Sequence, residues 1–108
     1  MTMARKKTSD AVEILKRRYA KTSKAKQALE QARASAEIAR RLYELRAEAG
    51  LTQAELAELV GTSRTVITRL EDDDYDGHSL SMLRRVAAAL NKRIEIRFVT
   101  AGKPGLPA

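Results

Sequence analysis

Residues 51–70 read LTQAELAELVGTSRTVITRL and contain two short apolar patterns of helical spacing, separated by a glycine at position 61. Thr52, followed three residues later by Glu55, has the spacing of a capping box that begins the first helix. Gly61 tolerates the positive φ that ends a helix, and Thr62 is then expected to cap the second one. The apolar faces comprise Leu56, Ala57, Val60, Ile67 and Leu70. The stretch therefore predicts two helices that cross steeply through a short turn.

The opposite face of the second helix carries hydroxyl and guanidinium groups without a single carboxylate: Ser63, Arg64, Thr65, Thr68 and Arg69. Arginine matches the two major-groove acceptors of guanine, while serine and threonine reach phosphates, base edges or a thymine methyl group. These side chains favour a helix that reads double-stranded DNA in the major groove. The alternative is an ordinary solvated helix face, but cap, turn, core spacing and charge all agree with a DNA-reading motif.

The segment LTQAELAELVGTSRTVITRLE closely resembles the XRE/Cro class of helix-turn-helix proteins, which have the fold of lambdoid phage repressors. The resemblance is specific over residues 40–91. It implies that Gln53 contacts backbone phosphates, and that Arg46 pairs with Glu71 at the end of the motif. The same resemblance gives base reading to Ser63, Arg64 and Thr65, with Arg69 one turn further on.

Composition sets limits on the class of protein. A chain of 108 residues suffices for one domain with a modest core, and it contains no cysteine for disulfides. It also lacks an apolar run of the ~20 residues that a membrane-spanning helix needs, and lacks a secretory pattern. We expect a cytoplasmic protein that neither enters a membrane nor forms disulfides. A net charge of +7 favours an anionic partner.

The positive charge is concentrated at the beginning of the chain. Residues 1–26 contain nine lysines and arginines against two acids, which accounts for the whole +7, because the remaining residues contain twelve cations and twelve acids. We expect residues 1–23 to form a basic arm with a short helix near residues 10–20, interrupted at Thr22 and Ser23. Such an arm strengthens DNA binding through phosphates or meets a protein partner; the alternative is a solubilising tail.

A second domain is expected over residues 24–99, followed by a loose tail at 100–108. Its long first helix runs from Lys24 to Ala49, and its closing helix is capped by Ser79 and stopped by Asn91. The acidic segment EDDDYDGHSL, which includes that cap, begins like a calcium-binding loop, but Leu83 stands where the bidentate glutamate is required. We therefore expect no metal site. The sequence also indicates no cofactor, no catalytic residues and no enzyme, since it lacks a paired nucleophile and base.

Residues 93–99, RIEIRFV, alternate apolar and charged side chains with a period of two, which predicts a strand. A lone strand leaves its backbone donors and acceptors unpaired, so we expect a second copy to supply the partner. Antiparallel pairing centred on Ile96 matches apolar with apolar groups and acid with base across the interface. The predicted homodimer interface consists of Ile94, Glu95, Ile96, Arg97 and Phe98. The alternative is a strand that packs on its own bundle.

The order of long helix, helix-turn-helix, acidic loop, closing helix and terminal strand is similar to that of HigA-type antitoxins. This resemblance implies a mainly α protein, a lambda-repressor-like bundle with an N-terminal helical arm and one C-terminal strand used for dimerisation. It further implies a repressor that binds its operator DNA and also neutralises a HigB-type ribonuclease toxin. Two alternatives stay open: a stand-alone XRE-type regulator without a toxin, and a helical adaptor that reads no DNA.

Overall fold

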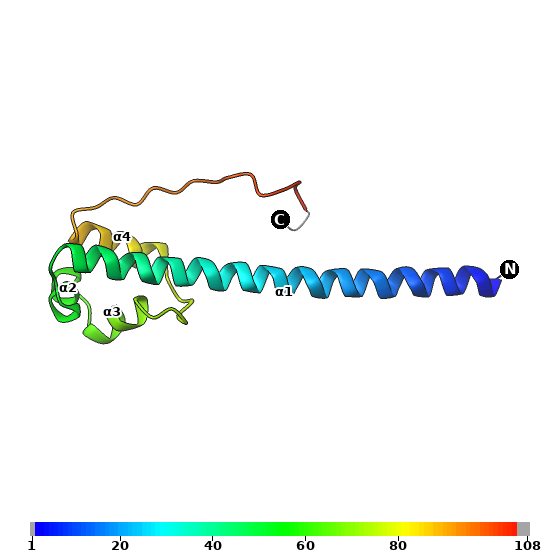
Figure 1. Ribbon diagram of the computed structural model, residues 1–108, viewed down its shortest axis with the longest axis horizontal. Helices are drawn as coiled ribbons and strands as arrows, with labels where there is room; N and C mark the ends of the chain where they lie inside the picture. Colours follow the sequence, from blue (N-terminus) through cyan, green and yellow to red (C-terminus); the bar gives the residue numbers. More distant parts are fainter. Residues whose placement is uncertain (1, 106–108) are drawn as a thin grey trace. The chain divides into compact units, whose positions relative to one another are not determined.

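The computed structural model describes residues 2–105, with side chains from residue 10 onward. Four helices lie within this range: α1 (Thr2–Glu48), α2 (Gln53–Val60), α3 (Arg64–Leu70) and α4 (Leu80–Ala89) (Figure 1). The chain divides into two compact units, residues 1–30 with 100–108 and residues 31–99. The predicted helical class is confirmed, and the whole helix-turn-helix lies in the second unit.

Helix α1 is continuous from Thr2 to Glu48, so the predicted interruption at Thr22 and Ser23 is wrong. The Thr22 hydroxyl donates a hydrogen bond of 2.9 Å to the carbonyl of Arg18. A hydroxyl that bonds the carbonyl four residues earlier is satisfied inside the helix, and it then does not break the helix. Almost every side chain from residue 10 to residue 34 is exposed.

The turn between α2 and α3 follows the predicted local chemistry. The Thr52 hydroxyl accepts the backbone N–H of Glu55 at 3.1 Å, and the Glu55 carboxylate accepts that of Thr52 at 3.0 Å, which confirms the capping box. The bond from the Thr52 backbone N–H is the main cause that lowers the pKa of Glu55. Gly61 has a φ of 78° and ends α2 in the left-handed conformation.

The cap of α3 is Ser63, one residue later than predicted. The backbone N–H of Thr62 still bonds the carbonyl of Ala57 at 2.9 Å, so Thr62 belongs to the C-terminal motif of α2. Ser63 therefore takes the cap position, and its hydroxyl accepts the N–H of Val66 at 3.3 Å. This shift leaves Arg64 as the first residue of α3.

One apolar core joins the helices of the second unit. Its seven buried residues come from the end of α1 and from α2, α3 and α4: Leu42, Leu56, Ala57, Val60, Ile67, Leu70 and Val86. Leu56, Ile67 and Val86 are each 1% exposed, which makes them the best-shielded large side chains. The two predicted ends of α4 are confirmed, because Ser79 caps it and Asn91 follows it with a φ of 57°.

The strand predicted at residues 93–99 is not formed. Within residues 2–105 there is no strand, and residues 93–99 have no regular secondary structure and no backbone hydrogen bonds of their own. The side chains of this segment alternate as a strand requires, but a strand also needs a second segment to complete its ladder. No other extended segment in the described part of the chain offers one.

We expect the replacement of Gly61 by alanine to destabilise the second unit by about 1 to 2 kcal/mol, because an alanine Cβ strains the left-handed conformation. An added Cβ would meet only the Arg85 guanidinium at 3.8 Å, an ordinary contact, so the loss reports backbone strain. Urea denaturation measures it. Gly61→Asn is the control and should lose clearly less, since asparagine tolerates this conformation; equal losses would contradict the explanation.

Candidate nucleic-acid interface

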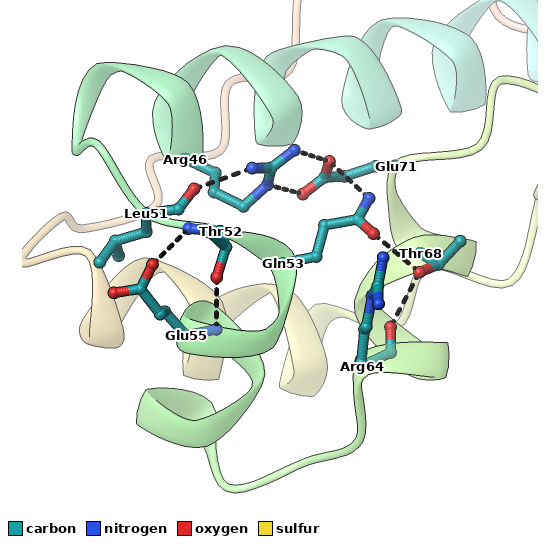
Figure 2. Close-up of polar contacts among 8 residues, drawn as sticks. All are labelled: Arg46, Leu51, Thr52, Gln53, Glu55, Arg64, Thr68 and Glu71. Carbon is teal, nitrogen blue, oxygen red and sulfur yellow. Dashed lines mark hydrogen bonds and ion pairs between the residues drawn. The ribbon is translucent and has the colours of Figure 1, made fainter.

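A buried ion pair joins the end of α1 to the residue that follows α3. Arg46 bonds Glu71 with two donors, Nε to Oε2 at 2.7 Å and Nη2 to Oε1 at 2.8 Å, and its Nη1 donates to the carbonyl of Leu51 at 2.8 Å (Figure 2). The two side chains are 13% and 4% exposed. The hydrogen bonds to Glu71 raise the pKa of Arg46. The pairing implied by the resemblance is present, and it also holds the turn before α2.

Gln53, the first residue of α2, is held by the same carboxylate. Its Nε2 donates to Glu71 Oε1 at 3.3 Å, while its Oε1 accepts the Thr68 hydroxyl at 3.0 Å (Figure 2). The opposite orientation of the amide would set its oxygen against a carboxylate, so the network itself determines the orientation. An amide nitrogen has two N–H donors. Gln53 therefore keeps one donor for a further acceptor.

Thr68 links the two helices of the motif. Its hydroxyl lies 3.0 Å from Gln53 Oε1 and 3.0 Å from the carbonyl of Arg64, one turn earlier in α3. Its single proton is shared between two acceptors that are already present. Thr68 thus positions Gln53 against α3, which is a more specific role than the sequence indicated.

The remaining predicted contact residues lie at the start of α3 or on its outer side. Arg64, Thr65 and Arg69 are exposed, and none of the three forms an ion pair among residues 10–105. The Ser63 hydroxyl already accepts the cap bond, so it is available to a ligand as a donor. A shallow hollow of about 480 Å³ is lined by Arg46, Thr52, Gln53, Ala54 and Arg64. The structure thus brings Gln53 and Arg64 to one surface from two helices.

Two residues that support helix ends have contacts that the sequence did not predict. Arg85 of α4 donates to the carbonyls of Val60 and Gly61 at 3.1 and 3.2 Å, where α2 leaves its last acceptors without partners. His78 Nε2 lies 2.7 Å from the carbonyl of Leu70 and closes the end of α3 in the same way. Cations and imidazoles near helix C-termini are a general signal. The helix whose last carbonyls Arg85 or His78 bonds is determined by tertiary contacts, which the local sequence does not show.

The described residues offer little sign of other chemistry. Among residues 10–105, no three histidine or acidic side chains lie together as metal ligands would. No helix in the described range has the length and apolar character needed to cross a membrane. The Asp72 carboxylate instead accepts the backbone N–H of Asp74 at 2.9 Å, as expected of a solvated turn.

Comparison with known proteins matches residues 42–96 to the family model described as helix-turn-helix. A protein from Archaeoglobus fulgidus described as an uncharacterized HTH-type transcriptional regulator is 42% identical over 59 residues. The match covers 55% of this chain and 83% of the relative. The family match includes α2, α3 and the surface that carries Gln53 and Arg64.

We expect Glu71→Gln to destabilise the second unit by about 3 kcal/mol, because it removes one partner of a buried charge pair. In a double-mutant cycle, Arg46→Met combined with Glu71→Leu should lose less than the two single changes together. Chemical denaturation measures the free energy of unfolding of Glu71→Gln and of the four proteins of the cycle, which are the wild type, Arg46→Met, Glu71→Leu and the double mutant. Glu44→Gln is the matched control, since Glu44 pairs with Arg41 at an exposed site, and it should change stability by under about 0.5 kcal/mol. Additive losses would show that the pair is not coupled.

Proposed function

The chain belongs to the XRE-type helix-turn-helix family, and from that premise we propose that it is a transcriptional regulator whose α3 reads a specific double-stranded operator. The observation that carries this proposal is that Thr68 links Gln53 to the backbone carbonyl of Arg64, which brings both residues to one surface. A phosphate contact and a base contact must keep a constant separation if they are to fit one register of the duplex. A hydrogen-bonded link between the two helices provides that constancy.

The two residues are assigned different tasks. Gln53 donates its free N–H to a backbone phosphate, which positions the protein without reading sequence. Arg64, Thr65 and Arg69 face base edges in the major groove, with the Ser63 hydroxyl as a further donor. Arg64 and Arg69 have no competing acid in the described residues, so their guanidinium groups meet DNA without breaking an ion pair.

We also propose that the regulator acts as a homodimer in which residues 93–99 of two copies pair. The segment supports this because its backbone groups lack partners within the described chain. Pairing centred on Ile96 sets Glu95 opposite Arg97 of the other copy. The exposed pair of Arg93 and Glu95 at 3.1 Å competes only weakly with that arrangement. Two-fold symmetry then presents two α3 helices to two half-sites.

The similarity of the element order to HigA-type antitoxins supports a finer proposal, that the N-terminal arm binds a ribonuclease toxin. Large apolar side chains at Val12, Ile14, Leu15 and Tyr19 are 43 to 63% exposed on this part of α1. Most helical stability in proteins comes from packing of an apolar face, so a partner surface would stabilise the arm. The arm is strongly basic, which suits an acidic patch on that partner. A stand-alone regulator is the alternative function, and it agrees equally well with the family.

We expect Arg64→Ala to weaken binding to the operator by roughly 1 to 3 kcal/mol while leaving binding to random DNA nearly unchanged, because a base contact is lost. Gln53→Ala should weaken both by similar factors, as a lost phosphate contact does. Fluorescence anisotropy with operator and scrambled duplexes at several salt concentrations separates the two patterns.

Arg84→Ala is the matched control for this experiment, because it removes the same charge from an exposed residue of α4 rather than α3. Its effect on operator binding should stay close to zero. If Arg64→Ala and Arg84→Ala reduce operator binding equally, general charge explains the loss and α3 is not the reading helix.

Deleting residues 1–22 should leave the thermal transition of the second unit nearly unchanged, because the core cluster begins only with Leu42. The truncated protein should fail to co-purify with the product of a neighbouring ribonuclease-like reading frame, whereas the full chain retains it. Circular dichroism and affinity co-purification provide the measurements. Loss of the thermal transition would make the arm part of the folding unit, and retained co-purification would contradict its role in toxin binding.

A further inference from the structure

An apolar groove of about 340 Å³ lies in the second unit between the last turns of α1 and α4. Its lining is largely aliphatic and comprises Ile38, Leu42, Leu45, Leu83, Val86, Ala87, Leu90 and Ile94. Charged side chains appear only at Arg41, Lys92, Arg93 and Glu95. A cavity of about 150 Å³ already holds a benzene ring, so this groove has room for an aromatic side chain.

The chain carries an aromatic side chain close to this groove in sequence, yet leaves it in solvent. Phe98 is the single phenylalanine of the chain and is 99% exposed, beside Val99 at 73% and Ile96 at 56%. Ile94, four residues before Phe98, is half-buried and lines the groove. An extended segment places these two residues about 13 Å apart, so Phe98 lies well beyond the Ile94 of its own chain.

A second copy removes this separation. This step rests on the proposed homodimer, in which residues 93–99 pair antiparallel about Ile96. Directly opposite residues in such a pair point to the same face, with Cβ atoms about 5 Å apart. The pairing sets the partner's Phe98 opposite Ile94, which is a lining residue of the groove. Glu95 at the rim then faces Arg97 of the second copy, so the charges at the groove edge match as well.

We propose that this groove is the socket for Phe98 of a second copy, so that two-fold symmetry fills two sockets with two phenylalanines. Val86 belongs both to the groove wall and to the core cluster that contains Ile67 of α3. The partner's phenylalanine therefore packs on the layer that supports the reading helix. Dimerisation and the placement of α3 are coupled through this contact.

The chain contains no tryptophan, so Phe98→Trp introduces a single emission reporter at the proposed contact. In the full-length protein at dimer concentrations, its emission should be blue-shifted and shielded from acrylamide. Dilution below the dimer dissociation constant should restore the emission of an exposed indole. Adding Ile96→Pro, which removes a ladder donor, should do the same. Sedimentation is measured on the same samples.

Two further variants test the two sides of the contact. Phe98→Ala should raise the dimer dissociation constant roughly tenfold to a hundredfold, as the loss of a central apolar anchor does. Leu45→Lys, at a half-buried position outside the core cluster, should weaken the dimer without changing the helical content, and in the Phe98→Trp protein it should also expose the indole. Val99→Ala is the matched control on the opposite face of the segment, and it should change the constant less than about threefold.

The outcomes distinguish failure of the proposed Phe98 contact from failure of the proposed homodimer. A dimer by sedimentation whose indole stays exposed overturns the socket and leaves the homodimer intact. A shielded indole in the monomeric Ile96→Pro protein would place the side chain at position 98 in its own groove, which also overturns the proposal. If the wild-type chain sediments as a monomer at every concentration, the homodimer itself fails, and the socket fails with it.

Discussion

The arrangement of the surface that carries Gln53 and Arg64 depends on one largely buried ion pair between Arg46 and Glu71. Removing two charges from water is costly, and such pairs are weak evidence for stability. Their value here is geometric, because a bidentate guanidinium and carboxylate have one good arrangement. Arg46 comes from the end of α1, while Glu71 follows α3. The position of α3 is therefore fixed against the last turns of α1. The bond from Arg46 to the Leu51 carbonyl also fixes the turn before α2.

The ion pair also prepares Gln53 for a ligand. The carboxylate that receives Arg46 still accepts a bond from Gln53, whose own oxygen is occupied by Thr68. Side-chain ordering is one of the costs of association, and a side chain that is already held has less freedom to lose. For Gln53 the cost is met during folding, because two of its hydrogen bonds form within the chain itself. The same network gives Thr68 of α3 a structural role, because its hydroxyl bonds both Gln53 and the carbonyl of Arg64.

Local features of this fold were predictable from sequence, and features that depend on distant partners were not. The capping box at Thr52, the left-handed Gly61 and the stop at Asn91 each need only a few neighbouring residues. The cap moved from Thr62 to Ser63 because the Thr62 N–H was already engaged with Ala57. The strand predicted at residues 93–99 is not formed, because a ladder needs a second segment. The contacts of Arg85 and His78 were not predictable, because their acceptors lie 24 or 25 residues and 8 residues away in sequence.

The distribution of charge limits how this domain distinguishes one DNA sequence from another. Residues 31–99 contain eleven cations and eleven acids, so the unit that carries α3 has no net charge. Nonspecific binding depends on cations near phosphates, so a domain without net charge gains little affinity from this interaction. In the proposed function, Arg64 and Arg69 therefore act through their position rather than through a general positive field. Because the excess charge resides in residues 1–26, the proposed function separates general attraction to a duplex, which the arm would supply, from the reading of one sequence by α3.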